Sequence, residues 1–96
     1  MDFEWDNKKN ESNLSKHGIS FEEAQHVFSE PVLTFIDERS DEYEEIREIS
    51  IGTLGEAVVI VVVHTDREGK IRLISARPAN RKERNTYYDY LQKTFS

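Results

Sequence analysis

The 96-residue sequence contains no cysteine, and this excludes disulfides, thiolate zinc sites and cysteine nucleophiles. Long apolar runs are also missing. The longest, AVVIVVV at residues 57–63, is far shorter than the ~20 residues that a membrane-spanning helix needs. The first residues, MDFEWDNKKN, lack the basic start and apolar stretch of a signal peptide. We therefore expect a cytoplasmic protein with no membrane partner.

The length predicts one domain over residues 1–96, with 36% hydrophobic residues to form its core. The net charge is −6, but the charge is unevenly distributed. Residues 1–66 hold 5 Lys and Arg against 16 Asp and Glu, whereas residues 67–84 hold 7 against 2. Because attraction at short range depends on local potential, the basic segment remains a candidate for binding an anionic partner.

Capping signals predict three helices. Asp6 caps a first helix that runs to about Lys16, where Gly18 stops it, and Leu14 is its main apolar contact. The Ser20–Glu23 capping box opens a second helix, which Pro31 ends. A similar signature at Asn80 and Glu83 opens a last helix, whose expected buried stripe is Tyr87, Tyr90 or Leu91, and Phe95.

Between these helices the pattern is typical of strands. VLTFI, IREISIG, AVVIVVV and IRLIS are rich in β-branched residues, and the acidic run DERSDEYEE separates the first two as a loop or hairpin end. AVVIVVV is apolar at both its odd and its even positions, which predicts a central strand covered on both faces. The predicted fold is α+β: two N-terminal helices, about four antiparallel strands and a C-terminal helix.

Motifs for metal and serine chemistry are missing. His17, His26 and His64 do not occur at the spacing of a zinc site, and the acidic run does not match a calcium loop. No Gly-x-Ser-x-Gly elbow and no glycine-rich phosphate loop is present. We therefore expect no metal and no cofactor.

The basic segment offers the clearest chemistry. On a helix that starts after Asn80, Arg81, Arg84 and Tyr88 share one face, and Arg77 lies just before it. Guanidinium groups bind phosphate oxygens bidentately, and tyrosine stacks on bases. An exposed basic helix that pairs with the chain's own carboxylates explains the same residues, so both readings stay open.

A four-residue turn at residues 66–69 would pair Thr65 with Lys70. Arg77 would then lie ~20 Å from His64, too far for one reacting phosphate. Arg72 and Arg77 have opposite parity, so they would face opposite sides of the sheet unless the strand bulges between them.

Several blocks in this order resemble the BrnT family of toxins, which belong to type II toxin–antitoxin modules and have a RelE-like fold. The blocks are FEWD, KHGISFEEAQHVF and VVVHTDREGKIRLISAR, followed by Glu83-Arg84. The resemblance implies a ribonuclease that cleaves RNA without a metal and inhibits translation. It also implies neutralisation by a cognate BrnA-like antitoxin, and binding of operator DNA only through the toxin–antitoxin complex.

Matching positions carry the roles that the resemblance implies. The candidate catalytic residues at these positions are Arg47, His64, Arg72 and Arg77, and the candidate RNA-binding residues are Lys16, His17 and Arg84. Arg81 and Tyr88 join the RNA-binding set because they share the helix face with Arg84. Either the strand register differs from the one above, or Arg47, His64 and Arg72 form the site and Arg77 and Arg84 bind RNA or antitoxin. The alternative function is a non-catalytic module that binds an antitoxin or nucleic acid through its basic C-terminal surface.

Overall fold

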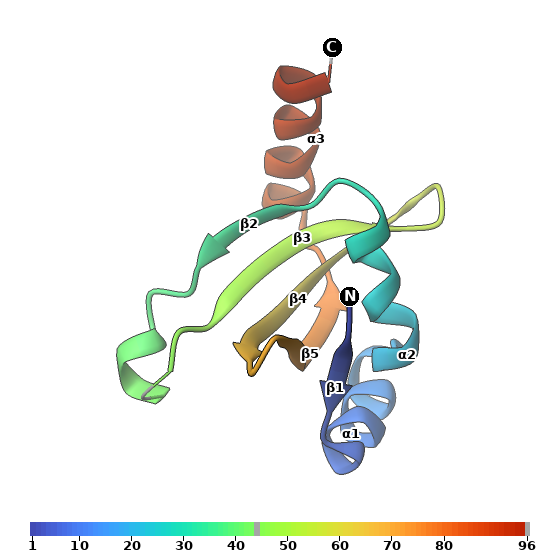
Figure 1. Ribbon diagram of the computed structural model, residues 1–96. Coiled ribbons are helices and arrows are strands. Elements are labelled where there is room, and N and C mark those ends of the chain that lie inside the picture. Colours follow the sequence, from blue (N-terminus) through green and yellow to red (C-terminus); the bar gives the residue numbers. More distant parts are fainter. Residues whose placement is uncertain (44, 96) are drawn as a thin grey trace.

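The computed structural model describes residues 1–43 and 45–95, so Glu44 of the acidic run lies outside the described residues. Five strands form one sheet in the order β1-β5-β4-β3-β2 (Figure 1). Their bounds are β1 Phe3–Trp5, β2 Leu33–Ile36, β3 Glu48–Leu54, β4 Val58–Arg67 and β5 Lys70–Pro78. The helices are α1 Asn7–His17, α2 Phe21–Ala24 and α3 Arg81–Phe95, with 3₁₀ helices η1 Gln25–Ser29 and η2 Ser40–Tyr43.

The α+β prediction is confirmed, but the sheet has one more strand than expected and is mixed. β1 pairs with β5 in parallel, whereas the other neighbouring strands are antiparallel. Three residues are too few to show a strand periodicity in the sequence. The pairing with β5 stabilises this segment, and the Ile71 N–H also donates to the Asp2 carbonyl oxygen at 2.9 Å.

The three predicted helix starts and the stop at Gly18 are confirmed by their capping contacts, whereas the second helix is α-helical only to Ala24 and continues as the 3₁₀ helix η1 to Ser29. The Asp6 carboxylate accepts from the N–H groups of Lys8 and Lys9, and Gly18 ends α1 with φ 73°, which favours glycine. Ser20 and Glu23 form the predicted reciprocal capping box. Asn80 and Glu83 exchange the equivalent two hydrogen bonds at the start of α3.

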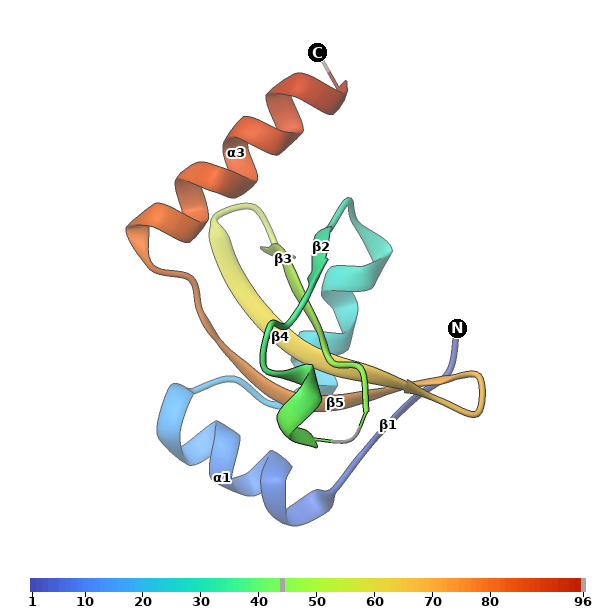
Figure 2. The same ribbon diagram turned by 90° about the vertical axis from the view of Figure 1, so that its left-hand side faces the viewer.

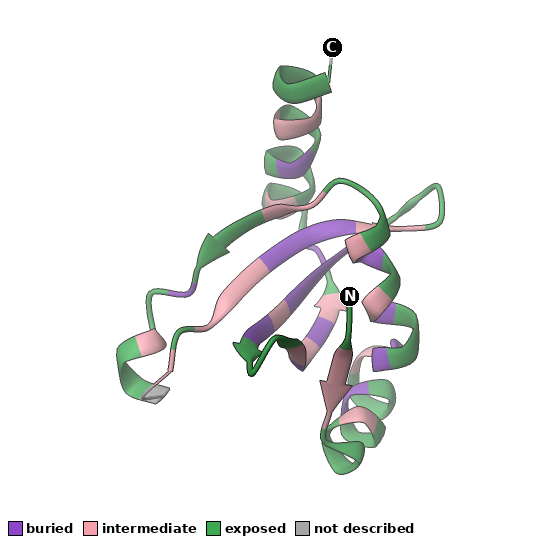
Figure 3. Cartoon of the chain, in the orientation of Figure 1, coloured by how far each residue is buried: buried purple, intermediate pink, exposed green. Residues whose placement is uncertain are grey.

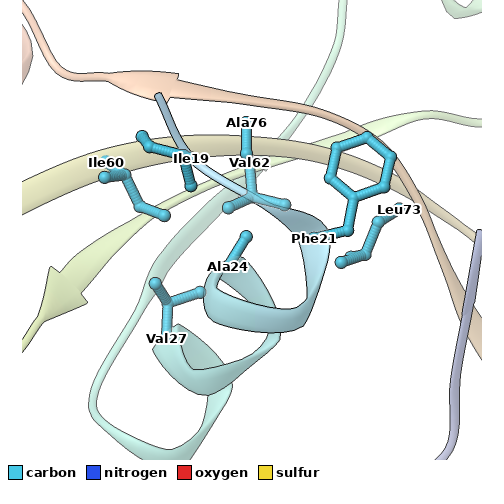
Figure 4. Close-up of a cluster of buried hydrophobic side chains, with 8 residues drawn as sticks. All are labelled: Ile19, Phe21, Ala24, Val27, Ile60, Val62, Leu73 and Ala76. Atoms are coloured by element: carbon cyan, nitrogen blue, oxygen red, sulfur yellow. The ribbon is translucent and has the colours of Figure 1, made fainter. Parts of the chain in front are cut away.

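The two faces of the sheet are packed differently. On the covered face, α2 and η1 bury a cluster with β4 and β5 (Figure 4); its buried members are Ile19, Phe21, Ala24, Val27, Ile60, Val62, Leu73 and Ala76. On the opposite face, which we call the open face, α3 packs at one end through Tyr87 against Ile51, Val59 and Val61. β4 therefore is the expected central strand with apolar side chains on both faces.

Two predicted helix contacts are wrong. Asn13, not Leu14, is the buried residue of α1: its side-chain amide bonds both the N–H and the carbonyl oxygen of Ala76. A polar side chain is buried there because it completes the backbone hydrogen bonds of β5 beyond the end of β1. Phe95 is 61% exposed, since the last turns of α3 project beyond the sheet (Figures 1 and 3).

The predicted register of the β4–β5 hairpin is also wrong. The turn has two residues, Glu68 and Gly69, whose φ values of 53° and 83° fit a type I′ turn, and Arg67 pairs with Lys70. Farther along, His64 pairs with Leu73 but Val63 pairs with Ser75, so Ile74 is the extra residue of a β-bulge.

Candidate functional site

The bulge at Ile74 determines which side chains share the open face. Arg72 pairs with Thr65 and Arg77 pairs with Val61, and Thr65 and Val61 have the same parity on β4. Arg72 and Arg77 therefore lie on one face, although their own parities differ. The two pairs are four positions apart along β4, which places the arginine backbones about 13 Å apart.

Each of these arginines is held by a carboxylate. Arg72 Nη1 lies 2.6 Å from Glu4 Oε2, across the β1–β5 pair. Arg77 donates from both terminal nitrogens to the two carboxylate oxygens of Glu83, at 2.8 and 2.7 Å. The hydrogen bonds from Arg77 hold the pKa of Glu83 below its ordinary value, and the same contact raises the pKa of Arg77.

From the sequence, Glu83 is predicted only as a capping residue and Glu4 is given no role. The alternation of Phe3, Glu4 and Trp5 is the one signal for Glu4, and three residues are too few to predict a strand from it. Glu4 is polar between two apolar residues, as in a short strand with one buried face.

Lys16 and His17 come close to the same strand from α1. They line a shallow pocket of about 260 Å³ with Lys9, Ser12, Asn13, Ile74 and Ser75. Ser75 pairs with Val63 and so faces the open side, between Arg72 and Arg77. The structure thus brings Lys16 and His17 to the bulge, and in Figure 2 β5 runs between α1 and α3.

Arg47 lies two strands away from Arg72. It directly precedes Glu48, which pairs with His64, so it is level with Thr65 at the end of β3. At ~4.8 Å between neighbouring strands, the backbones of Arg47 and Arg72 are about 10 Å apart. Arg47 is half-buried, and its charge contributes, after the hydrogen bonds from Arg39, to lowering the pKa of Asp37.

The candidate RNA-binding residues of α3 point in several directions. Arg84 donates from Nη1 to the Ala79 carbonyl oxygen at 3.0 Å. Arg81 lines a shallow surface hollow with Lys82, Asn85, Thr86 and Asp89. Tyr88 is 46% exposed and contacts the ring of Tyr87.

His64 lies on the covered face and is separated from the arginines. It is 5% exposed, its Nε2 lies 2.7 Å from Ser50 Oγ, and its ring packs edge-on against Phe28 at 5.1 Å. Burial lowers the pKa of His64 to about 4, so the imidazole is neutral at pH 7. The corrected register places Arg77 opposite Val61, only about 10 Å along β4 from His64 rather than ~20 Å, but on the other face.

The described residues contain neither a carboxylate and histidine cluster fit for a metal nor a membrane-spanning helix. Over residues 1–43 and 45–95, no three His, Asp or Glu side chains gather as a metal site. No helix in these ranges is both long and apolar enough to span a bilayer.

Comparisons with known proteins agree with this fold. The family model of the ribonuclease toxin BrnT, of type II toxin–antitoxin systems, matches residues 5–83. No curated protein matches the chain. The crystal structure of the Brucella abortus ribonuclease toxin BrnT has the same fold, with a TM-score of 0.67 and 24% identity over 84% of this chain and 99% of that one. The chain therefore belongs to the BrnT family of ribonuclease toxins of type II toxin–antitoxin systems.

Proposed function

We propose that this protein is a cytoplasmic endoribonuclease that cleaves RNA without a metal ion, inhibits translation and is neutralised by a cognate BrnA-like antitoxin. In this proposal, operator DNA is bound only by the toxin–antitoxin complex. The observation that carries the proposal is the bulge at Ile74, which aligns Arg72 and Arg77 on the open face beside Ser75. Family membership gives the ribonuclease class, and the arginine pair gives a location for the chemistry.

The proposed reaction uses the RNA's own hydroxyl. The 2′-OH loses its proton to a base and attacks the adjacent phosphorus, the O2′–P bond forms and the P–O5′ bond breaks. An acid then protonates the 5′ oxygen. Arg72 and Arg77 stabilise the negative charge that develops on the phosphoryl oxygens, since fixed guanidinium groups need no reorganisation during the reaction.

We assign proton transfer to His17 rather than to His64. His17 is half-buried in the pocket that contains Ser75, which faces the arginine side of the sheet. His64 is buried on the covered face, against Phe28 and Ser50. Lys16, Arg47, Arg81, Arg84 and Tyr88 are assigned to binding the RNA around this centre.

The carboxylates support the assignment of the two arginines. Glu83 accepts from both terminal nitrogens of Arg77, and this fork geometry fixes the plane of the guanidinium. Glu4 anchors Arg72 through the single contact between Oε2 and Nη1. In the free protein these pairs hold the cations in place, and a phosphate then binds the N–H groups that remain.

The test is RNA cleavage in EDTA. Purified protein is incubated with a messenger RNA, with and without ribosomes, beside Arg72→Ala, Arg77→Ala and His17→Ala. We expect wild-type cleavage to persist in EDTA and each variant to lose about 10²–10³-fold in rate. Lys93→Ala is the matched control, because it removes an exposed cation near the far end of α3.

A separate experimental result would contradict each part of the proposal. Intact RNA in both wild-type reactions would favour the non-catalytic module, which uses the same basic surface only to bind an antitoxin or nucleic acid. Loss of cleavage in EDTA would overturn the metal-free mechanism. Full cleavage by Arg72→Ala and Arg77→Ala would overturn the arginine assignment.

A further inference from the structure

The edge of the sheet farthest from α1 exposes apolar side chains. β2 is the last strand in the sheet order, and Phe35 and Ile36 on it are 45% and 62% exposed. Ile46, just before β3, is 65% exposed. Figure 3 shows β2 exposed over most of its length, whereas the neighbouring strands carry the buried residues. Adjacent exposed apolar residues on an edge strand are typical of an interaction surface.

The backbone of β2 presents unsatisfied hydrogen-bonding groups at this edge. The Asp37 N–H donates to the Arg47 carbonyl oxygen at 2.8 Å, so this pair bonds inward to β3. Because antiparallel pairs alternate, Ile36 and Thr34 occupy the non-hydrogen-bonded positions, opposite Glu48 and Ser50. Their backbone N–H and C=O groups therefore point away from β3, where an added strand can pair with them.

Shallow hollows flank Ile36 on both sides. One, of about 500 Å³, is lined by Ile36 and Ile46 beside Thr65, and the other, of about 300 Å³, by Ile36, Phe35 and Ile49. In strand addition the backbone bonds give affinity, and pockets for alternate side chains give specificity. The two hollows supply such pockets for apolar side chains of an added strand.

The rim of this surface determines the charge of the partner. Carboxylates dominate the lining of these two hollows and of a third beside Ile46; they are Asp37, Glu38, Asp41, Glu45, Glu48 and Asp66, whereas Arg39 is the cation that lines them. RNA would be repelled here. A second copy of the chain would bring the same carboxylates into contact, and like charges across an interface disfavour it. The complementary occupant is an extended segment with apolar and basic residues.

We propose that β2 is the docking site for an extended, basic and apolar segment of the antitoxin, which adds a strand to the sheet at residues 33–36. The identity of the partner rests on the proposed function, whereas the surface itself does not. β3 and β4 lie between β2 and β5, so this interface is separate from Arg72 and Arg77, whereas Arg47 adjoins it through its hydrogen bond with Asp37. It also gives the acidic half of the chain a role that RNA binding does not.

The test measures binding of the purified cognate antitoxin by calorimetry, with amide hydrogen exchange of the complex. Ile36→Lys should weaken binding tenfold or more, the ~1.4 kcal/mol expected when a central contact is lost. Val58→Lys is the matched control, because Val58 is also an exposed (49%) apolar strand residue. It is the first residue of β4, at the end of the sheet away from Ile36. In the wild-type complex the Ile36 N–H should become protected, and free Ile36→Lys should cleave RNA at the wild-type rate.

The outcomes separate this inference from the proposed function. Docking on β2 is overturned if Ile36→Lys and Val58→Lys weaken antitoxin binding equally. It is also overturned if the Ile36 N–H stays unprotected in the complex. Both conclusions hold even if the chain cleaves RNA. If the free chain self-associates and Ile36→Lys abolishes this self-association, the occupant of β2 is a second copy. That result would also overturn antitoxin docking on β2. A chain that cleaves no RNA but binds the antitoxin through β2 contradicts only the nuclease proposal.

Discussion

The covered and open faces of β4 alternate residue by residue, yet they have different environments. Val62 and His64 are buried against α2 and η1, whereas Val63 is only half-buried and Arg72 and Arg77 flank the open side. On the covered face burial keeps the His64 imidazole neutral at pH 7. On the open face Arg72 and Arg77 each have a carboxylate partner. Both faces contribute buried side chains, since α3 also buries Val59 and Val61 on the open face, but in our proposal only the open face carries the phosphate chemistry.

Neighbouring valines of β4 give the largest expected contrast. Val62→Ala should lower the free energy of unfolding by roughly 2–3 kcal/mol, because it leaves a cavity between the sheet and α2. Val63→Ala should cost less than about 1 kcal/mol, because Val63 already contacts solvent. Urea unfolding of the two variants measures both values. Equal losses would show that the open face is packed as tightly as the covered one.

The free energy of unfolding should depend on pH through His64, which is buried on the covered face. Its pKa is about 4 in the folded chain and about 6.5 when unfolded, so the unfolded state takes up the proton first. The corresponding stability is fully present above pH 6.5 and declines as the pH falls toward 4, by on the order of 2–3 kcal/mol. His64→Gln should remove this component.

Urea unfolding of wild type and His64→Gln at pH 7 and pH 4.5 isolates that component, because all other titrating groups are common to both proteins. An equal loss in the two proteins would contradict a buried, neutral imidazole. RNA cleavage at pH 7 should be retained by folded His64→Gln, and loss of cleavage there would return His64 to the reacting groups.

Glu83 gives the smallest change in stability. Glu83→Gln should lower the free energy of unfolding by about 1 kcal/mol or less, since the ion pair is partly exposed and the amide keeps one oxygen for the cap. Cleavage should fall several-fold because Arg77 is no longer held. Parallel measurements of unfolding and of kcat for cleavage test the two effects. A change in stability without any change in kcat would contradict a positioning role for Glu83.

The local signals in the sequence were sufficient for the helices and the central strand. Asp6, Ser20 and Asn80 cap helices through contacts within three residues, and AVVIVVV is apolar on both parities. They were not sufficient for the site, because its geometry depends on a bulge and a two-residue turn. A non-glycine residue, Glu68, adopts positive φ in that turn, so its composition did not reveal the register.

The ion pair between Glu4 and Arg72 illustrates the same limit. It joins residues 68 positions apart through a parallel strand of three residues. The alternation of Phe3, Glu4 and Trp5 is too short to predict a strand, so the pairing becomes visible only once the sheet has been assembled. Lys16 and His17 were predicted from the family resemblance, but their closeness to Ser75 depends on how α1 packs along β5.

The most direct test of the central claim is methyl and imidazole NMR with a 2′-O-methylated RNA oligonucleotide, which lacks the attacking hydroxyl and is not cleaved. Val62 and Val63 provide matched methyl probes on the two faces of one strand. RNA should shift the Val63 methyl signals and leave the Val62 methyls and the His64 ring unchanged. Shifts at Val62 and His64 with Val63 unchanged would contradict the assignment of RNA binding to the open face.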